Sequence, residues 1–263
     1  MMNYKYNLRK DKFDERDFHF AHSISPIASV KLPPSVDLRY KCPPVYDQGE
    51  LGSCTANAGC ACRALLANNS RLMLSRLFLY YMERSLKGTV TEDSGASVRD
   101  ICKAANKFGI CEEMYMPYDV NNFSIQPSND AINNAQVYKI NSYRKLNTLD
   151  EIKQNIAFRQ QGVLAGMDVY DSFQSEEVAR TGRMTIPKST EQNYGGHAVL
   201  IVGYIDTQNT LSKLKFMFKW SEAPQGYLIV RNSWGANWGE HGYFYMPYEF
   251  VTKGYAYDFW TMI

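Results

Sequence analysis

The sequence predicts an α+β fold in which a mainly helical half precedes a mainly strand-forming half. Helical patterns free of proline fall between about residues 54 and 107, and short runs of β-branched and aromatic residues follow from Val137 onward. A chain of 263 residues that is 45% hydrophobic and 14% aromatic can bury a sizeable core. We therefore expect one compact domain over residues 32–263, with a helical part at about 36–135 and a β-rich part at about 136–263.

Residues 1–31 read as an N-terminal extension. They carry many charges and no apolar run resembling the core of a signal peptide, so we expect an intracellular or virion protein. No apolar stretch in the chain approaches the roughly 20 residues needed to cross a bilayer. After the extension, the prolines of Leu32-Pro33-Pro34 predict an extended start to the domain, because proline fixes its own backbone and biases its predecessor away from helix.

Three helices are predicted in the first half. An alanine-rich stretch from Cys54 to about Ala67 follows Ser53, which stands where a side chain could cap the first turn. Two further helices are expected at 75–86 and 97–107, and the second should end at Gly109. The second half contains the expected strands, at 137–143, 162–169, 197–204, 216–218, 227–231 and 242–246.

Charge and cysteine usage exclude several classes of function. A net charge of +2, from 29 basic and 27 acidic residues, gives no electrostatic reason to expect nucleic acid or an anionic membrane as partner. Six cysteines are too few for a disulfide-dense scaffold and are expected to be reduced. Cys60-Ala-Cys62 lacks the spacing of a structural zinc site, so we expect no metal and no cofactor.

Cys54 is a candidate nucleophile because of its place at the start of a helix. A thiol reacts as its thiolate, which the unpaired amides and the dipole of a helix N-terminus stabilise. The preceding Gly49 and Gly52 allow a sharp turn and leave room for a substrate carbonyl. Cys60, Cys62 and Cys102 lie in helix interiors, where a buried packing role is the ordinary interpretation.

The imidazole partner of such a thiol is found by elimination among four histidines. His19 and His22 lie in the extension, and His241 lies in a glycine-flanked turn where exposure to solvent is the default. His197 instead opens the apolar run 198–204, so a rigid strand could hold its ring in one tautomer, as acid and base chemistry requires.

Asn232 is the candidate for a third group that orients this histidine. It ends the predicted strand 227–231 and begins a turn with Trp234 and Trp238, whose rings could keep water from an amide–imidazole hydrogen bond. Alone, an asparagine before a glycine-rich turn would be only a turn residue.

Taken together, these segments resemble the papain and cathepsin family of cysteine peptidases. The family's motifs occur in the family's order, and the resemblance covers about residues 32–250. The matching segments are Leu32-Pro33-x-x-Val36-Asp37-Leu38-Arg39, Gln48-Gly49-x-x-Gly52-Ser53-Cys54, Gly196-His197-Ala198-Val199, and Asn232-Ser233-Trp234-Gly235-x-x-Trp238-Gly239-x-x-Gly242-Tyr243.

The resemblance implies a two-lobed fold with the active site in the cleft between a helical lobe and a β-barrel-like lobe. It implies that Cys54 attacks the peptide bond to form a thioester, that His197 is general base and acid, and that Asn232 orients the histidine. Gln48 and the backbone amide of Cys54 would form the oxyanion hole. Substrate binding is assigned to a further set of residues, Gly95, Ala96, Gly196 and Trp234, with Trp234 also shielding the histidine.

Departures from the family pattern predict a microbial or viral branch. Thr55 replaces the aromatic residue that usually follows the nucleophile, and Leu51 replaces a cysteine. Because the segment Asp93-Ser94-Gly95-Ala96 also lacks its cysteine, the family's first disulfide cannot form. Residues 206–226 read as an inserted hairpin or loop. The family's extensions commonly inhibit, so we expect residues 1–31 to cross the cleft as a short prosegment, with a disordered charged tail as the alternative. The side chains expected to anchor it are its aromatics, Tyr4, Tyr6, Phe13, Phe18 and Phe20.

The sequence leaves two other functions open. An acyltransferase or transglutaminase-like enzyme uses the same thioester chemistry, although its third residue is typically an aspartate. An inactive homologue could bind peptides in the cleft, although it would not need all four motif residues. The expected partners of the chain, itself expected to be a monomer, are peptide or protein substrates.

Overall fold

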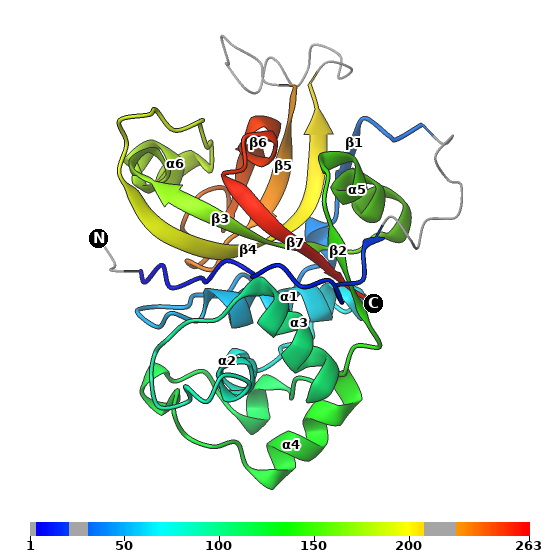
Figure 1. The fold of residues 1–263 in the computed structure, drawn as a ribbon, viewed down its shortest axis with the longest axis vertical. Coiled ribbons are helices and arrows are strands. Elements are labelled where there is room, and N and C mark those ends of the chain that lie inside the picture. Colours follow the sequence, from blue (N-terminus) through cyan, green and yellow to red (C-terminus); the bar gives the residue numbers. More distant parts are fainter. Residues whose placement is uncertain (1–3, 21–30, 208–224) are drawn as a thin grey trace.

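A helical lobe and a β-sheet lobe pack against each other, and helix α1 (Cys54–Leu66) lies where they meet (Figure 1). The computed structural model describes residues 4–20, 31–207 and 225–263. Helix α1 contacts helix α2 (Arg76–Ser85) on one side and strand β4 (Asn193–Asp206) on the other. Most of its residues are buried for this reason, among them the small side chains that bring the two lobes close together. The expected two-lobed α+β arrangement is confirmed.

The helical lobe also contains α3 (Val98–Lys107) and α4 (Asn129–Ala135). Ser75 Oγ accepts a hydrogen bond from the N–H of Phe78 at the start of α2, and Ser97 forms a capping box with Asp100 at the start of α3. The helices predicted at 75–86 and 97–107 are therefore confirmed to within a residue. The expected cap of α1 is wrong, because the Ser53 side chain makes no hydrogen bond to the helix backbone.

The second lobe is built on an antiparallel sheet with the strand order β2-β7-β3-β4-β5-β6, with β1 paired to β4 off this path. Strand β4 is the longest and is buried along most of its length, because neighbours flank it on both edges and α1 covers it. The other strands are β1 (Ser35–Asp37), β2 (Tyr143–Leu146), β3 (Val163–Tyr170), β5 (Gly226–Arg231), β6 (Tyr243–Pro247) and β7 (Ala256–Met262).

Short helices complete this lobe: α5 (Leu149–Gln154), which continues as a π-helical turn over Asn155–Arg159, α6 (Glu176–Thr181) and α8 (Tyr248–Thr252). Single 3-10 turns lie at 39–41, 113–115, 120–122, 136–138 and 171–174.

Two strand predictions do not match these bounds. The strand expected at 137–143 is wrong, since residues 136–138 form a 3-10 turn and β2 begins only at Tyr143. The strand expected at 216–218, and most of the loop expected at 206–226, lie outside the described residues. No helix in the described part of the chain is long and apolar enough to cross a membrane.

Residues 4–20, here called the N-terminal arm, cross the molecule between the two lobes. In Figure 1 the arm, in dark blue, passes between the sheet and helices α1 and α3. It forms parallel bridges from Asn7 to Gly196 in the sheet lobe and from Arg9 to Ser97 in the helical lobe. The arm therefore contacts both walls of the space between the lobes.

The later part of the arm is anchored through buried polar groups. Asp11 accepts a hydrogen bond from the indole of Trp260, with a donor–acceptor distance of 2.8 Å. Asp17 and Arg99 form an ion pair at 2.6 Å in which both side chains are less than a tenth exposed. Phe20 is 1% exposed and belongs to the core, but the expectation that Phe13 and Phe18 anchor the arm is wrong, since they are 85% and 68% exposed.

Candidate active site

Cys54 is the first residue of α1 and is 0% exposed. The turn before it depends on Gly49, whose φ of 58° few other residues adopt without strain. Gly52 next contributes its backbone N–H to the Asp93 carboxylate at 3.1 Å. The Sγ atom of Cys54 accepts the N–H of Ala198 at 3.4 Å, which places the thiol beside the residue that follows His197 in β4.

His197 and Asn232 are directly paired. His197 lies in β4, opposite Met167 of β3, and its Nε2 is 2.8 Å from the side-chain oxygen of Asn232. An amide oxygen can only accept a hydrogen bond, so Nε2 carries the proton in this pair. The remaining nitrogen, Nδ1, has no hydrogen-bond partner among the described residues. In a neutral ring, Nδ1 is then a proton acceptor and can take the thiol proton.

Aromatic rings cover this pair. The ring centroid of Trp234 lies 5.1 Å from that of His197 at an interplanar angle of 30°. Trp238 and Phe173 pack against Trp234 at 5.0 and 5.4 Å. Trp234 is 5% exposed, so the imidazole–amide hydrogen bond lies beneath apolar atoms that keep water away from it.

Gln48 is held in one orientation. Its side-chain oxygen accepts from Ser233 Oγ at 2.7 Å, and its Nε2 donates to the carbonyl of Leu51 at 3.1 Å. The primary amide has two N–H bonds, so one remains for a further acceptor. The backbone N–H of Gln48 donates to the carbonyl of Ser233 at 2.9 Å, which links this turn to the residue after Asn232.

Sequence reasoning missed the residues that support this turn. The Tyr118 hydroxyl donates to the carbonyl of Gln48 at 2.9 Å and lies 2.6 Å from Ser53 Oγ, which also accepts from the Asn57 amide at 3.1 Å. These contacts explain why Ser53 does not cap α1. Tyr118 lies far from Gln48 in the sequence, and a single tyrosine gives no periodic or motif signal.

A second missed pair lies where the family's first disulfide would have been. The Asp93 carboxylate accepts from both the Gly52 N–H and the Tyr80 hydroxyl, and that hydroxyl accepts the N–H of Gly95 at 3.2 Å. All six cysteines are free. The turn before Cys54 and the segment around Gly95 are thus joined by hydrogen bonds in place of a covalent bond.

The N-terminal arm contacts the histidine and the residues expected to bind substrate. Tyr4 stacks on Trp234 with centroids 4.5 Å apart, and Tyr6 meets the His197 ring edge-on at 6.2 Å. The N–H of Leu8 donates to the carbonyl of Gly196 at 3.2 Å. The other wall is contacted in the same way, since the N–H of Arg9 donates to the carbonyl of Ala96 at 2.9 Å and the carbonyl of Asn7 lies only 2.1 Å from where a Gly95 Cβ would be.

Burial changes the titration of both the cysteine and the histidine. Removal from solvent raises the pKa of Cys54 to about 12 and lowers the pKa of His197 to about 4. The expected low-pKa thiol is therefore not found in this arm-covered state. The amides at the start of α1 favour the thiolate, but loss of water around the sulfur is the larger effect.

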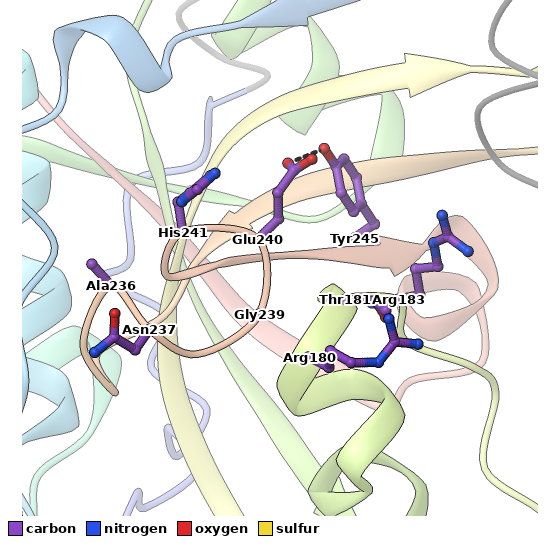
Figure 2. Close-up of a pocket in the computed structure, with 9 residues that line it drawn as sticks. All are labelled: Arg180, Thr181, Arg183, Ala236, Asn237, Gly239, Glu240, His241 and Tyr245. Atoms are coloured by element: carbon purple, nitrogen blue, oxygen red, sulfur yellow. Dashed lines mark hydrogen bonds between the residues drawn. The ribbon is translucent and has the colours of Figure 1, made fainter.

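A separate surface pocket lies between α6 and the loop 236–241 (Figure 2). Arg180, Arg183 and His241 contribute to its wall, and the Glu240 carboxylate in it accepts a hydrogen bond from the Tyr245 hydroxyl. None of the predicted site residues lines this pocket. No group of three His, Cys, Asp or Glu side chains that could bind a metal occurs in the described residues.

Comparison with known proteins is consistent with this geometry. The chain is 38% identical over 229 residues to an uncharacterized peptidase C1-like protein of Acanthamoeba polyphaga mimivirus, covering 82% of this chain and 68% of that one. It is 30% identical to vignain of Phaseolus vulgaris over 85% of this chain, but spans only 57% of vignain.

Among solved structures, the chain superimposes on xylellain, a cysteine protease from Xylella fastidiosa, with a TM-score of 0.82 and 35% identity over 100% of this chain and 98% of that one. A procathepsin L2 proteinase from Tenebrio molitor larval midgut shares the fold, with a TM-score of 0.71 at 22% identity over 98% of this chain and 78% of that one. The model of the papain family of cysteine proteases matches residues 32–255. The chain belongs to the papain family of cysteine proteases.

Proposed function

We propose that this chain is a cysteine endopeptidase that hydrolyses peptide bonds through a thioester on Cys54. The observation that carries the proposal is the buried His197–Asn232 pair, with its free Nδ1, on the strand whose next residue contacts the Cys54 sulfur. His197 takes the thiol proton, and the sulfur then bonds to the substrate carbonyl carbon. The imidazolium returns the proton to the departing amine as the C–N bond breaks. Water, deprotonated by His197, then hydrolyses the thioester and regenerates the thiol.

Gln48 is proposed to stabilise the oxyanion of both tetrahedral intermediates, together with the backbone N–H of Cys54. Its amide is fixed by Ser233 and Leu51, so a donor is oriented before substrate arrives. Asn232 acts through the histidine. Replacing it with alanine should therefore cost less turnover than replacing His197, which moves the proton itself.

Residues 1–31 are proposed to be a short inhibitory prosegment. The arm places Tyr6 against the His197 ring and uses the backbone of Gly196 and Ala96, so substrate and arm cannot occupy the cleft together. An ion pair between Lys5 of the arm and Asp93, at 2.7 Å, helps to fix the position of the arm at the exposed edge of the cleft. Removal of the arm from the cleft, by cleavage or by opening, is then required for activity.

The substrates are proposed to be peptides or proteins cleaved by a monomer. The proposed location is the cytoplasm or a virion, and the six free cysteines suit the reducing cytoplasm, because no disulfide is needed to hold the turn at Gly52 to the segment at Gly95. Acyl transfer to an amine stays the alternative chemistry. Asn232, where transglutaminase-like enzymes typically carry an aspartate, weighs against it.

The test is cleavage of a quenched fluorogenic peptide library, with and without an added primary amine. Hydrolysis lost in Cys54→Ala and kept in Cys62→Ala, a buried cysteine of the same helix, supports the proposal. Product that carries the amine would favour acyl transfer. Peptide binding without cleavage by any folded preparation would indicate an inactive homologue.

A further inference from the structure

Leu8 of the arm occupies a pocket formed by two glycines and a tyrosine. A Cβ placed on Gly166 would lie 2.8 Å from Leu8 Cδ2 and 2.6 Å from a ring carbon of Tyr257, and a Cβ on Gly196 would lie 3.1 Å from Leu8 Cβ. Leu8 is 8% exposed there. Because Gly166 and Gly196 have no side chains, Leu8 can lie against their backbone beside the Tyr257 ring. When the arm leaves, a substrate side chain can take the place of Leu8.

The inner end of this pocket is polar. The Tyr257 hydroxyl lies 2.8 Å from the position of a Gly196 Cβ, has no accessible surface, and makes no hydrogen bond of regular geometry among the described residues. Burial and, after it, the neighbouring Asp168 carboxylate raise the pKa of Tyr257 well above its ordinary value. Buried hydroxyls are normally paired, since a lost hydrogen bond to water must be replaced. Leucine fills the volume beside this hydroxyl but offers it no partner.

An acidic group adjoins the same tyrosine. Asp168 of β3 pairs in register with Gly196, one position from the Met167–His197 pair, so its place in the sheet is fixed close to the catalytic histidine. Its side chain is 13% exposed and forms an ion pair with Lys10, with 3.4 Å between Asp168 Oδ2 and Lys10 Nζ. That same ammonium lies 4.0 Å from the centroid of the Tyr257 ring. Asp168 and Tyr257 thus already bind one cation, the ammonium of Lys10 in the arm.

When the arm moves, Asp168 and Asp258 both lose an arm contact, while Lys145 and Arg99 stay near Asp258. Asp258 holds the backbone N–H of Asp11 at 2.7 Å, an arm contact that is lost with the arm. Lys10, the cation at this position, also belongs to the arm.

We propose that Tyr257 and Asp168 form a cation-binding subsite that selects substrates with lysine or arginine in the pocket now filled by Leu8. The proposal rests on the peptidase activity proposed above and names the substrate class for it. The methylenes of such a side chain cover the apolar walls, while its N–H groups reach the Tyr257 hydroxyl and the Asp168 carboxylate. Sites with such partners discriminate against side chains that leave them unpaired. The arm binds the two halves of the site separately, with Leu8 in the pocket and Lys10 at its charged edge.

The experiment lets pairs of peptide substrates compete for the enzyme. The two peptides differ at one of the four positions before the scissile bond, which carries leucine, methionine, glutamine, lysine or arginine. Two substrates in one tube report the ratio of their kcat/KM values, and this ratio does not depend on the fraction of molecules with an open arm. The full chain is used, with Leu8→Asp in the same full chain to raise that fraction. Variants are Asp168→Asn and Tyr257→Phe, and the charge-matched control is Asp119→Asn, an exposed residue of the helical lobe.

We expect a preference for lysine or arginine over leucine at one position, reduced about tenfold by Asp168→Asn and unchanged by Asp119→Asn. Tyr257→Phe should reduce it less, because the aromatic face remains. A preference for leucine that Asp168→Asn leaves unchanged overturns the subsite while the peptidase function stands. No Cys54-dependent cleavage of any peptide overturns both proposals.

Discussion

Replacing Leu8 with alanine in the full chain should activate the enzyme by opening the arm. Leu8 is 8% exposed and packs against Gly166, Gly196 and Tyr257, so alanine loses most of its apolar contact. Truncating a buried leucine costs about 2 kcal/mol at the low end of the usual range, which suits a segment that partly faces solvent. If closed molecules dominate, the open fraction and the apparent kcat/KM should rise about 30-fold.

The assay compares initial rates on one fluorogenic peptide at substrate concentrations well below KM. Tyr4→Ala, which removes the stack on Trp234, should give a smaller rise of about fivefold. Phe13→Ala is the control in the same segment, because Phe13 is 85% exposed and should change nothing. A synthetic peptide of residues 4–20 should inhibit the Leu8→Ala enzyme. Equal kcat/KM for wild type and Leu8→Ala, together with no inhibition by that peptide, would refute the inhibitory role of the arm.

Point substitutions are better suited to this question than deletion of residues 1–31. Phe20 lies in the core at 1% exposure, and Asp17 forms a buried ion pair with Arg99. Deletion would leave the guanidinium of Arg99 without that partner and a cavity where Phe20 had been, each of which destabilises the fold. A truncated chain could lose activity by unfolding, whereas Leu8→Ala keeps these anchors.

Other outcomes follow from the same contacts. Gln48→Ala should lower kcat on the order of 100-fold in a chain whose circular dichroism is unchanged; an unchanged kcat would remove Gln48 from the oxyanion hole. Burial raises the pKa of Asp258 from 3.8 to about 6, so its ionisation destabilises the fold as pH rises through that range. Asp258→Asn, which keeps an acceptor for the Asp11 N–H, should therefore raise the melting temperature at pH 8 more than at pH 4, and an equal rise at both would contradict this. Melting temperatures with and without reductant should coincide, because all six cysteines are free; a large drop on reduction would show a disulfide. Iodoacetamide near pH 6 should label Cys54 faster in Leu8→Ala than in wild type. Equal labelling rates would show that the arm does not control the reactivity of the thiol.

The site could be predicted from the sequence to the extent that it depends on local motifs. Cys54 follows a glycine turn and begins a helix, and His197 and Asn232 adjoin strands with continuous apolar runs, so each has a signal within about ten residues. The structure brings all three together with Gln48. Tyr118, Tyr80 and Asp93 had no such signal, because their partners are defined only by the approach of distant segments.

The strand errors have a related cause. The predicted strand 137–143 has β-prone residues, but a 3-10 turn follows α4 at residues 136–138, because tertiary context overrides so weak a preference. Strand β7 was missed because Asp258 interrupts its apolar pattern and adopts a φ of 53°, which a non-glycine residue rarely does. The Asp258 carboxylate also accepts a hydrogen bond from the backbone N–H of Asp11. The residue that departs from regular strand geometry is therefore one that anchors the arm.

The arm affects the chemistry of the dyad as well as access to it. With the arm in place, burial keeps the Cys54 thiol protonated and the His197 imidazole neutral, since their pKa values of about 12 and about 4 lie on either side of any physiological pH. Departure of Tyr6, which meets the His197 ring edge-on, admits water beside the imidazole and weakens the desolvation that lowers its pKa. The amides at the start of α1 then favour the thiolate, and the thiolate in turn favours the imidazolium. A small alkylating agent at neutral pH should therefore label Cys54 more slowly in the closed molecule than in the open one, even where the reagent can pass the arm.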